Sequence, residues 1–571
     1  PSQSDFLPPP PLPTDLGELV PPPYGFLEHG LASPVVEFAK LLGHSQERRY
    51  LFEQLKGMIA DTSSDRARTA WFFETIEDST FVIYKHSKLL LNTSSDAKVY
   101  LGGCLMGEYA SHERDMIRSY FAYYAQPVAI KQYFEKESKI EINPFHMLPR
   151  GTDGIINYMA SFDVGGVEMY TVQELGLVSV DKMLPELSLE EQLKMVRGAC
   201  LSIRELHKRP GGPIVHRDIR TPNFLLSDTG CIKVCDFGIS RILPDVLPLR
   251  SQGGVMSLTS LSYQPYEVQV AAQRVAEERE QSAMSLLSSN DFSFYDQEFS
   301  SNVPVTTSGD IFMLGLVLYK LVNKVDAMSN SDIVNKRAPD LSMIIRLFAG
   351  GEMLAHLLSS MLSHEAAKRP SIDQVLEHPF FKSWNENALY VQGLYRELHD
   401  AEGVRYTENF KVLEMVLQPL EQQANWKTCL QNLPAHLRSR IVGNKDIPPV
   451  LLPEGAGSKP HPLPNLHEAL QYLLYFFVHF RDHKIFPYMY SELRTVLREH
   501  EAAGEFVYAH PSLSWVLPKF WETKLFYMQH LQNEQQVWEK EWAMMQRKNE
   551  EVRSSLRMKE RKVKSLLGSV V

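Results

Sequence analysis

The chain has 571 residues, of which 44% are hydrophobic and 22% are charged, and its net charge is −10. These values are ordinary for globular proteins and exclude a mostly disordered chain, a collagen and a coiled-coil rod. The acidic balance argues against a protein built wholly to coat nucleic acid, and the length allows about four domains. Prolines are unevenly placed, because nine of the 35 fall within the first 23 residues.

The five cysteines are sparse and odd in number, which argues against a disulfide framework and for a reducing compartment. Cys231 and Cys235 have no second cysteine pair at zinc spacing, so we expect buried strand cysteines rather than metal ligands. The longest apolar stretch, residues 469–480, is too short to span a bilayer, and the N-terminus lacks a signal-peptide pattern. We therefore expect a cytoplasmic protein without a membrane partner.

The first segment, residues 1–34, is a proline-rich head with proline runs at 8–11 and 21–23. Proline fixes φ and removes a backbone donor, so this head is expected to be an extended polyproline II segment. Two interpretations stay open. The head is either a docking ligand for a proline-recognising partner or an arm packed on the body of the protein.

The next segment, residues 35–80, has apolar positions that recur at intervals of three and four, which predicts a helical leader. Short strand-like runs follow at 81–84, 89–91 and 99–101. The pattern then becomes mixed up to about residue 181 and helical up to about residue 384.

Two polar inserts, at 270–306 and 446–464, are predicted to be loops, and the second holds six prolines and two glycines. The last segment, residues 531–571, has the heptad pattern of one long helix. Between residues 547 and 564 this segment carries eight basic and three acidic side chains. It is either a dimer or partner helix or a helix packed on its own domain with a solvated basic face.

The most informative stretch lies between residues 214 and 240. Three motifs follow one another there: His216-Arg217-Asp218, then Asn223, then Asp236-Phe237-Gly238. With these motifs at this spacing, the sequence resembles the eukaryotic protein kinases over roughly residues 95–384. The resemblance implies a bilobal fold that uses ATP and Mg²⁺ to phosphorylate a protein substrate.

The resemblance also implies roles for these residues. Asp218 would accept or orient the proton of the attacking hydroxyl, and Asn223 and Asp236 would supply oxygen ligands to Mg²⁺, which prefers them. Arg220 takes the place where serine/threonine kinases usually carry lysine, and it keeps a positive charge near the transferred phosphate. The alternative interpretation is a pseudokinase that keeps this set of residues without catalysis.

Upstream, residues 128–131 read Val-Ala-Ile-Lys, which resembles the kinase strand whose lysine grips the nucleotide phosphates. Lys131 would be that lysine. Its glutamate partner would be Glu141, although Pro144 lies three residues later and would break a helix interior. Glu137 is the alternative partner.

The resemblance further places the phosphate-covering loop at residues 101–107 and the hinge beneath adenine at 172–176. Gly102 and Gly107 would be the first and last glycines of that loop, with Cys104 at the middle position, where its side chain could hinder approach of the backbone to phosphate. In the hinge, backbone groups of Glu174 and Gly176 would bind the base, with Gln173 as the gatekeeper residue.

Two further pairings concern the scaffold rather than the chemistry. Glu267 is expected to pair with Arg369, and Asp310 corresponds to the aspartate that braces the catalytic loop in kinases.

Behind the kinase-like part, residues 385–530 read as all-helical and resemble the ribonuclease module of ribonuclease L and of the inositol-requiring sensor of the unfolded-protein response. In that family an Arg-Asn pair precedes a histidine that acts as general acid or base. Here Arg481 and Asp482 fill the pair, and Phe486, which cannot transfer a proton, takes the histidine's place. We therefore expect a regulatory or dimerisation module in which RNA is not cleaved; an endoribonuclease using His479 or His483 is the alternative.

The expected fold is α+β: a bilobal protein kinase fold followed by an all-helical ribonuclease-like domain and a long C-terminal helix. The expected order of domains is the head, the helical leader, a smaller lobe at 81–175, a larger lobe at 176–384, the helical domain at 385–530 and the basic helix at 531–571. The expected activity is that of a protein kinase, serine/threonine-directed, within a homodimer; a nucleotide-binding scaffold is the competing function.

Overall fold

The computed structural model describes ten stretches of the chain, together with residue 277 and scattered positions between 521 and 554. The ten stretches are 34–63, 70–93, 97–133, 151–164, 168–237, 239–243, 263–274, 305–348, 351–382 and 543–548. The chain divides into two compact units, residues 1–383 and residues 384–571. Most of the second unit, including the predicted ribonuclease-like domain with His479, His483 and Phe486, lies outside the described residues.

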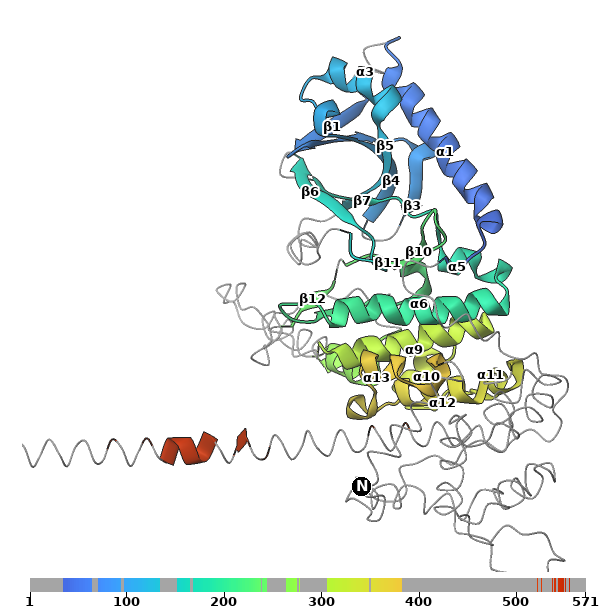
Figure 1. Ribbon diagram of the computed structural model, residues 1–571, viewed down its shortest axis with the longest axis vertical. Coiled ribbons are helices and arrows are strands. Elements are labelled where there is room, and N and C mark those ends of the chain that lie inside the picture. Colours follow the sequence, from blue (N-terminus) through green and yellow to red (C-terminus); the bar gives the residue numbers. More distant parts are fainter. Residues whose placement is uncertain are drawn as a thin grey trace, which may run out of the picture. The chain divides into compact units, whose positions relative to one another are not determined.

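The first unit has an upper lobe built on one antiparallel sheet (Figure 1). The strands follow the order β1-β2-β4-β5-β7-β6, and β3 pairs with β4 beside that path. Their bounds are β1 Trp71–Ile76, β2 Ser79–Tyr84, β3 Leu90–Thr93, β4 Ala97–Met106, β5 Gln126–Tyr133, β6 Tyr158–Val164 and β7 Glu168–Glu174. The three strand-like runs predicted between residues 81 and 101 are confirmed, since they fall in β2, β3 and β4.

The sheet has a hydrophobic core on each face, because successive side chains of a strand point to opposite sides. In β2, Val82 belongs to one core while Phe81 and Ile83 belong to the other. The first core is covered by two helices, α1 (Phe38–Ala60) and α3 (Arg114–Tyr124). The second lies inside the curl of the sheet, where aromatic rings of neighbouring strands meet, among them Phe162 and Tyr170 with centroids 5.6 Å apart.

The helical leader predicted over residues 35–80 is correct only up to the end of α1 at Ala60. Trp71 to Ile76 is a strand, joined to β2 by a turn in which Glu77 has a φ of 50°. This run is Trp-Phe-Phe-Glu-Thr-Ile, and aromatic and β-branched residues favour a pleated, half-buried surface. Local strand propensity and the hairpin partner therefore outweigh the three-and-four periodicity.

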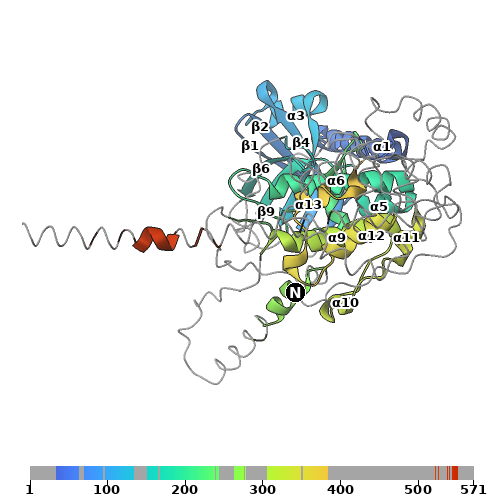
Figure 2. The same cartoon turned by 60° about the horizontal axis from the view of Figure 1, so that its bottom comes forward.

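The lower lobe is mainly helical (Figures 1 and 2). Its helices are α5 Val180–Met183, α6 Leu189–His207, α9 Thr307–Asn323, α10 Asn330–Val334, α11 Ser342–Leu347, α12 Gly351–Met361 and α13 Ile372–Leu376. Its short strands are β8 Val178–Ser179, β9 Ile214–Val215, β10 Phe224–Leu226, β11 Ile232–Val234 and β12 Arg241–Ile242. Short 3₁₀ turns complete the described elements: η2 Ser87–Leu89, η3 Gly107–Tyr109, η5 Leu184–Glu186, η6 Thr221–Asn223, η7 Ala366–Lys368 and η8 Pro379–Phe381.

Two long helices, α6 and α9, form the centre of this lobe and pack against each other. α6 begins with a capping box, in which the Ser188 hydroxyl accepts from the Glu191 N–H and the Glu191 carboxylate accepts from the Ser188 N–H. α9 is buried on nearly all sides, as expected of a core helix. The site described below lies near the C-terminal end of α6 and the N-terminal end of α9, where His207 meets Asp310, and on the short strands next to them.

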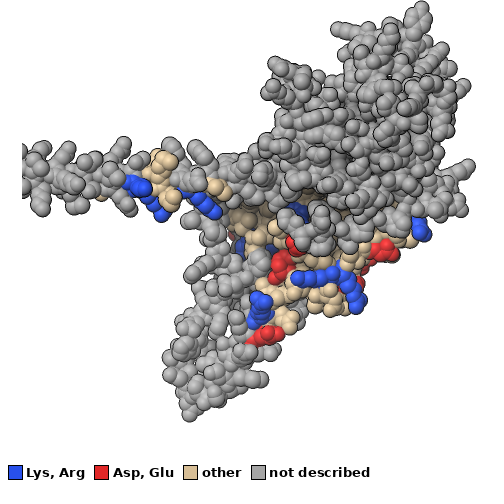
Figure 3. Space-filling view, turned by 90° about the horizontal axis from the view of Figure 1, so that it is seen from below, with Lys and Arg blue, Asp and Glu red and all other residues tan. Residues whose placement is uncertain are grey.

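The surface of the described part is mixed in charge. In the view from below, basic and acidic side chains of the described residues are interspersed (Figure 3), which is typical of an ordinary solvated surface. Within the described stretches, no helix has the length and apolar character needed to cross a membrane. The described positions between 537 and 554 are helical and exposed, in agreement with the helix predicted for the tail.

Candidate functional site

The loop that carries Asp218 runs from β9 to η6, and a buried carboxylate holds its start. Asp310, in the first turn of α9, accepts hydrogen bonds from the backbone N–H groups of His216 at 2.7 Å and Arg217 at 2.9 Å. Its side chain also lies 3.0 Å from Nε2 of His207 and is fully buried. Arg217 has a φ of 69°, a conformation that costs free energy outside glycine. The prediction that Asp310 braces this loop is confirmed.

The Asp218 side chain is held by two neighbours. The amide nitrogen of Asn223 donates at 2.8 Å both to the Asp218 carboxylate and to its backbone carbonyl. Nε of Arg220 lies 3.2 Å from the same carboxylate. Burial raises the pKa of Asp218, Arg220 opposes this rise, and the nearby negative charge of Asp236 adds to it. A carboxylate with a raised pKa is better able to take a proton in the transition state.

His216 links this loop to the Asp236 segment. The Asp218 N–H donates to Nδ1 of His216, so the ring proton lies on Nε2, which donates to the carbonyl of Cys235 at 3.0 Å. The His216 ring also packs on Phe237 with centroids 5.0 Å apart. Tyr158 meets the same Phe237 ring edge-on at 5.7 Å. The stack therefore connects the upper lobe, the Asp236 segment and the loop that carries Asp218.

Lys131 projects from β5 toward Asp236, which follows β11. The two side chains form an ion pair, with Lys131 Nζ 2.6 Å from Asp236 Oδ1. Burial opposes the charge of Lys131, but the Asp236 carboxylate holds its pKa above the usual range. Asp236 itself has a φ of 68°, the second strained backbone position of the site. Because the Cys235 N–H donates to the Asn223 carbonyl at 2.8 Å, Lys131, Asp236, Asn223 and Asp218 lie in one connected site.

The donor set fits Mg²⁺ better than a transition metal. Among the described residues no group of three or more His, Cys, Asp or Glu side chains gathers as a metal site, whereas Mg²⁺ is commonly held by one or two carboxylates and phosphate oxygens. Asn223 uses its amide nitrogen on Asp218, which leaves its amide oxygen for a cation. Burial is the main cause of the raised pKa of Asp218, and the negative charge of Asp236 adds to it. A divalent cation would offset the negative charge of these two carboxylates.

The hinge predicted at 172–176 connects β7 to β8. The Glu174 N–H donates to the Asn157 carbonyl at 2.9 Å, so only the carbonyl of Glu174 remains for a base. The Glu174 side chain pairs with Lys233. A Cβ on Gly176 would lie 2.7 Å from Leu225 of β10, so this residue has to be glycine for β10 to approach the hinge. Gln173 is buried in β7.

The prediction of a phosphate-covering loop at 101–107 is wrong, because Gly102 lies inside strand β4 and not in a loop. A Cβ on Gly102 would stand 2.2 Å from the Ile130 side chain, so close packing explains this glycine. Gly107 has a φ of 59° and starts the turn after β4. The Cα partner of Lys131 is Val99, so Gly107 lies about 25 Å further along β4.

The connection at the Lys131 end of β4 is the hairpin from β3 to β4. In the spacing G-x-G-x-x-G-x-V that covers phosphates in kinases, this chain has Asn92, Ser94, Ala97 and Val99. No glycine occurs from 92 to 97, which hid the hairpin from a motif search. The signal for this hairpin in the sequence is Val99, which stands at the valine position of that spacing ahead of the Val-Ala-Ile-Lys strand. Residues 94–96 lie outside the described residues.

Several other predicted site residues can be placed. Glu141, Glu137 and Gly238 lie outside the described residues. Cys104 is buried in β4, and burial raises the pKa of its thiol to about 11, so it is a packing residue rather than a reactive one. Cys231 and Cys235 flank β11 as buried cysteines that form no disulfide, in agreement with the prediction of buried cysteines.

The predicted pair of Glu267 and Arg369 is confirmed. Nη1 and Nη2 of Arg369 donate to the two carboxylate oxygens of Glu267 at 2.6 and 2.9 Å, a bidentate ion pair. The Arg369 side chain is fully buried, and it also donates to the carbonyls of Ser363 and Ser308. This pair anchors the segment that follows the Asp236 motif onto the lower lobe.

Comparisons with known proteins point to the same part of the chain. Residues 123–259 match the family described as protein tyrosine and serine/threonine kinase. The serine/threonine-protein kinase Nek4 of Mus musculus is 25% identical over 239 residues, which cover 41% of this chain and 24% of Nek4. The serine/threonine-protein kinase Nek1 of Mus musculus is 24% identical over 207 residues, 35% of this chain and 14% of Nek1.

A third relative is the serine/threonine-protein kinase-like protein CCR4 of Arabidopsis thaliana, 27% identical over 151 residues, with 26% of this chain and 16% of that protein covered. The chain thus spans a quarter or less of the length of each of these relatives. The family match contains Lys131, Asp218, Asn223 and Asp236.

Proposed function

We propose that this chain, whose residues 123–259 match the protein tyrosine and serine/threonine kinase family, transfers the γ-phosphoryl group of ATP, with Mg²⁺, to serine or threonine hydroxyls of a protein substrate. The observation that carries the proposal is the connected set formed by Lys131, Asp236, Asn223 and Asp218. These four side chains come from three separate segments, and their convergence supports a common task.

Phosphoryl transfer depends on positioning and on charge neutralisation more than on covalent chemistry. Asp218, fixed by Asn223 and Arg220, orients the substrate hydroxyl and accepts its proton. Lys131 leaves Asp236 to bind the nucleotide phosphates. Asn223 and Asp236 would hold Mg²⁺, which supplies positive charge to the phosphates when bound. Glu174 and Gly176 would bind the base through their backbone.

The serine/threonine direction rests on the names of the relatives. Arg220 departs from the lysine that serine/threonine kinases usually carry at this place, but it keeps the positive charge. Its guanidinium lies beside Asp218, where it places a positive charge near the transferred phosphate. A protein substrate follows from the same proposal.

Labelled ATP and a generic protein substrate test the kinase activity. Replacing Asp218 by Asn is expected to lower phosphoryl transfer at least about a hundredfold, the contribution usual for a positioned base. Asp228→Asn is the matched control, because this aspartate is exposed on the turn between β10 and β11. Equal activities of the wild type and Asp218→Asn, with nucleotide binding intact, would contradict the proposal.

The competing function is a nucleotide-binding pseudokinase scaffold. It is favoured by the hairpin from 92 to 97, where side chains replace the glycines that let the backbone approach phosphate. This alternative predicts MgATP binding by the intact chain, lost on Lys131→Met, without phosphoryl transfer above the Asp218→Asn level.

For residues 385–530 the proposal stays as the sequence gives it: a helical ribonuclease-like module that serves regulation or homodimerisation and does not cleave RNA. Phe486 at the place of the family's histidine supports it. Cleavage of a structured RNA by the intact chain, lost on His483→Ala or His479→Ala but kept on Asp218→Asn, would overturn it. The head at 1–34 is proposed as the site for a proline-recognising partner.

A further inference from the structure

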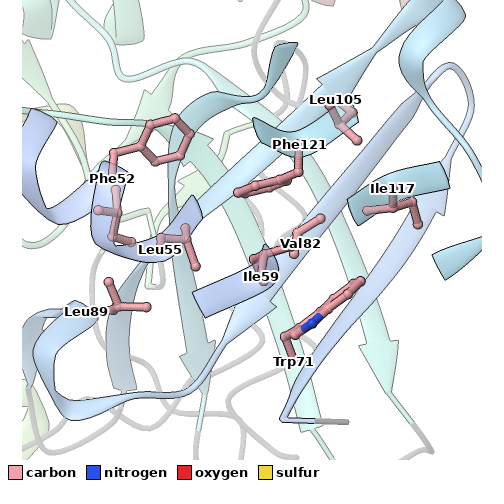
Figure 4. Packing of buried hydrophobic residues seen from close by; sticks show 10 residues of the cluster. Phe52, Leu55, Ile59, Trp71, Val82, Leu89, Leu105, Ile117 and Phe121 are labelled. Carbon is pink, nitrogen blue, oxygen red and sulfur yellow. The ribbon is translucent and has the colours of Figure 1, made fainter. Parts of the chain in front are cut away.

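Helix α1 contacts both lobes of the first unit. In Figure 1 it runs beside the sheet from the upper lobe down to the lower lobe. Its upper half belongs to the sheet core, where Phe52, Leu55 and Ile59 pack with side chains of β1, β2, β4 and α3 (Figure 4). Arg118 of α3 donates to the Ile59 carbonyl at 3.1 Å. This half of the helix is therefore a fixed part of the upper lobe.

The lower end of α1 is bound to the other lobe. Just before the helix, the Val35 N–H donates to the Gly230 carbonyl at 2.9 Å, and the Val36 side chain is buried. Lys40 forms an ion pair with Glu191 at 2.5 Å, at the start of α6. Burial tends to raise the pKa of Glu191, but Lys40 and the Ser188 and Glu37 N–H groups lower it, so the carboxylate is charged and paired.

Between these two ends, Arg48 reaches the hinge. Its Nε and Nη2 both donate to the carbonyl of Leu177, at 3.2 and 3.1 Å. Burial lowers the pKa of this guanidinium, against the effect of Glu47, which shows that the charge has lost much of its solvent. Leu177 is also held from the lower lobe, since its N–H donates to the Leu226 carbonyl at 2.8 Å.

The residue before Leu177 is Gly176, proposed above to bind the base. Glycine restricts its own backbone least of all residues, so the orientation of the hinge depends on the peptides that follow Gly176. Leu226 holds the first of them through the Leu177 N–H, and Arg48 holds the second through the Leu177 carbonyl. Arg48 supplies two donors in a rigid planar fork, and it is part of a helix fixed in both lobes. Its contact thus sets the hinge backbone relative to both lobes.

We propose that Arg48 is a positioning residue for the nucleotide: by holding the Leu177 carbonyl from outside the cleft, it keeps Glu174 and Gly176 oriented toward the base. The inference rests on the proposed function for the identity of the ligand. The positioning role of Arg48 differs from a role in stabilising the fold, because other residues already anchor the upper and lower ends of α1.

The test compares Arg48→Met with Arg49→Met, since Arg49 is the next residue of the same helix and is exposed. MgADP binding to the intact chain is measured by calorimetry and hydrogen exchange is followed over residues 174–180. Arg48→Met is expected to raise the Kd for MgADP at least about fivefold, the lower end of usual coupling between sites. It should also speed exchange in the hinge, while Arg49→Met changes neither. Arg48→Lys, which keeps a charged donor but loses the planar fork, should recover part of the affinity.

In the kinase assay the same substitution should raise KM for ATP and leave kcat nearly unchanged, because Arg48 does not contact the reacting atoms. A lower urea midpoint for Arg48→Met with unchanged MgADP affinity and unchanged hinge exchange would overturn the proposal and leave a structural role. If the wild type binds MgADP without phosphoryl transfer, the kinase proposal fails, but the MgADP affinities of the variants still test the role of Arg48. If the wild type binds no MgADP, the exchange rates of the hinge test that role, and equal rates in Arg48→Met and Arg49→Met overturn it.

Discussion

Two backbone positions of the site, Arg217 and Asp236, lie in the left-handed region, which costs each of them free energy that its surroundings must offset. For Arg217 the offset comes from Asp310, which accepts its N–H and that of His216. The loop geometry is thus held by a residue about ninety positions away in the sequence, and the pattern of kinase motifs was sufficient to predict that contact.

Replacing Asp310 by Asn tests this support. Asn has one acceptor oxygen and would turn donors toward the two N–H groups that Asp310 binds. We expect the free energy of unfolding to fall by about 3 kcal/mol, as when a buried charged partner is removed. Urea unfolding followed by circular dichroism measures it. Asp326→Asn is the control, because Asp326 is half exposed and pairs only with Lys320 in the described part. Equal midpoints for the two variants would contradict the role of Asp310.

His378 makes stability depend on pH. Burial lowers its pKa well below the usual value, helped by His356 and Lys382. Since the folded state disfavours the protonated ring, this contribution to stability is present above the unfolded pKa near 6.5 and is lost as pH falls below it. The loss is at most about 1.4 kcal/mol for each pH unit.

The measurement is the urea midpoint at pH 7.5 and at pH 5.5. In the structure Nδ1 of His378 accepts the Phe380 N–H that caps η8, and Asn can make the same cap. His378→Asn is therefore expected to show a smaller fall in midpoint between the two pH values than the wild type. An equal fall in both proteins would show that His378 does not titrate as described.

At the level of elements, close packing between β4 and β5 explains a glycine that the sequence placed in a nucleotide loop. A Cβ at 102 would meet Ile130 at 2.2 Å and the Val82 carbonyl at 2.9 Å. Gly102→Ala is expected to lower the free energy of unfolding by about 1–3 kcal/mol, the usual cost of overpacking. The Kd for MgADP of the folded protein should stay unchanged.

Gly57→Ala is a control for which we expect the opposite change in stability. Gly57 is in α1 and has nothing within 4 Å of its missing Cβ. Alanine is the better helix former, so this variant should be more stable by about 0.5–1 kcal/mol. Chemical denaturation of both variants gives their free energies of unfolding. A Gly102→Ala protein that is as stable as the wild type but binds nucleotide more weakly would restore the interpretation of Gly102 as part of a phosphate-covering loop.

Element types were predictable where local signals agreed. The three strand runs between 81 and 101 combine apolar and β-branched residues, and they are strands. The helical periodicity before residue 60 predicts a helix over 35–80, but residues 71–76 pair with β2 as a hairpin, a contact that only the folded chain supplies. Gly102 was misplaced for a similar reason: a glycine required by packing looks the same in a sequence as one required by phosphate.

At the scale of the whole molecule, the kinase family match and the folded unit begin at different residues. The match begins at residue 123, inside α3, whereas α1 and β1 to β4 precede it and build one wall of the sheet core. The motifs predicted which residues meet in the candidate site, because their types and spacing follow from the chemistry of phosphate. They gave no information on α1, whose role depends on contacts with both lobes.

A fragment of residues 123–383 should therefore fail to fold cooperatively, while residues 34–383 should unfold in one transition. The shorter fragment removes β4 and leaves an edge of β5 unpaired, which favours aggregation. Size-exclusion chromatography and urea unfolding distinguish the two. A monomeric 123–383 fragment with a cooperative transition would show that the upper lobe does not need its N-terminal elements.

The shared use of Glu191 has a consequence for how this protein can change over generations. One carboxylate caps α6 through Ser188 and holds α1 through Lys40. A substitution at 191 therefore disturbs a cap and an anchor in one step, and its effects will not add to those of a change at 40. Ser188, Lys40 and Glu191 should vary as a set among descendants of this sequence, since single replacements pass through a less stable intermediate.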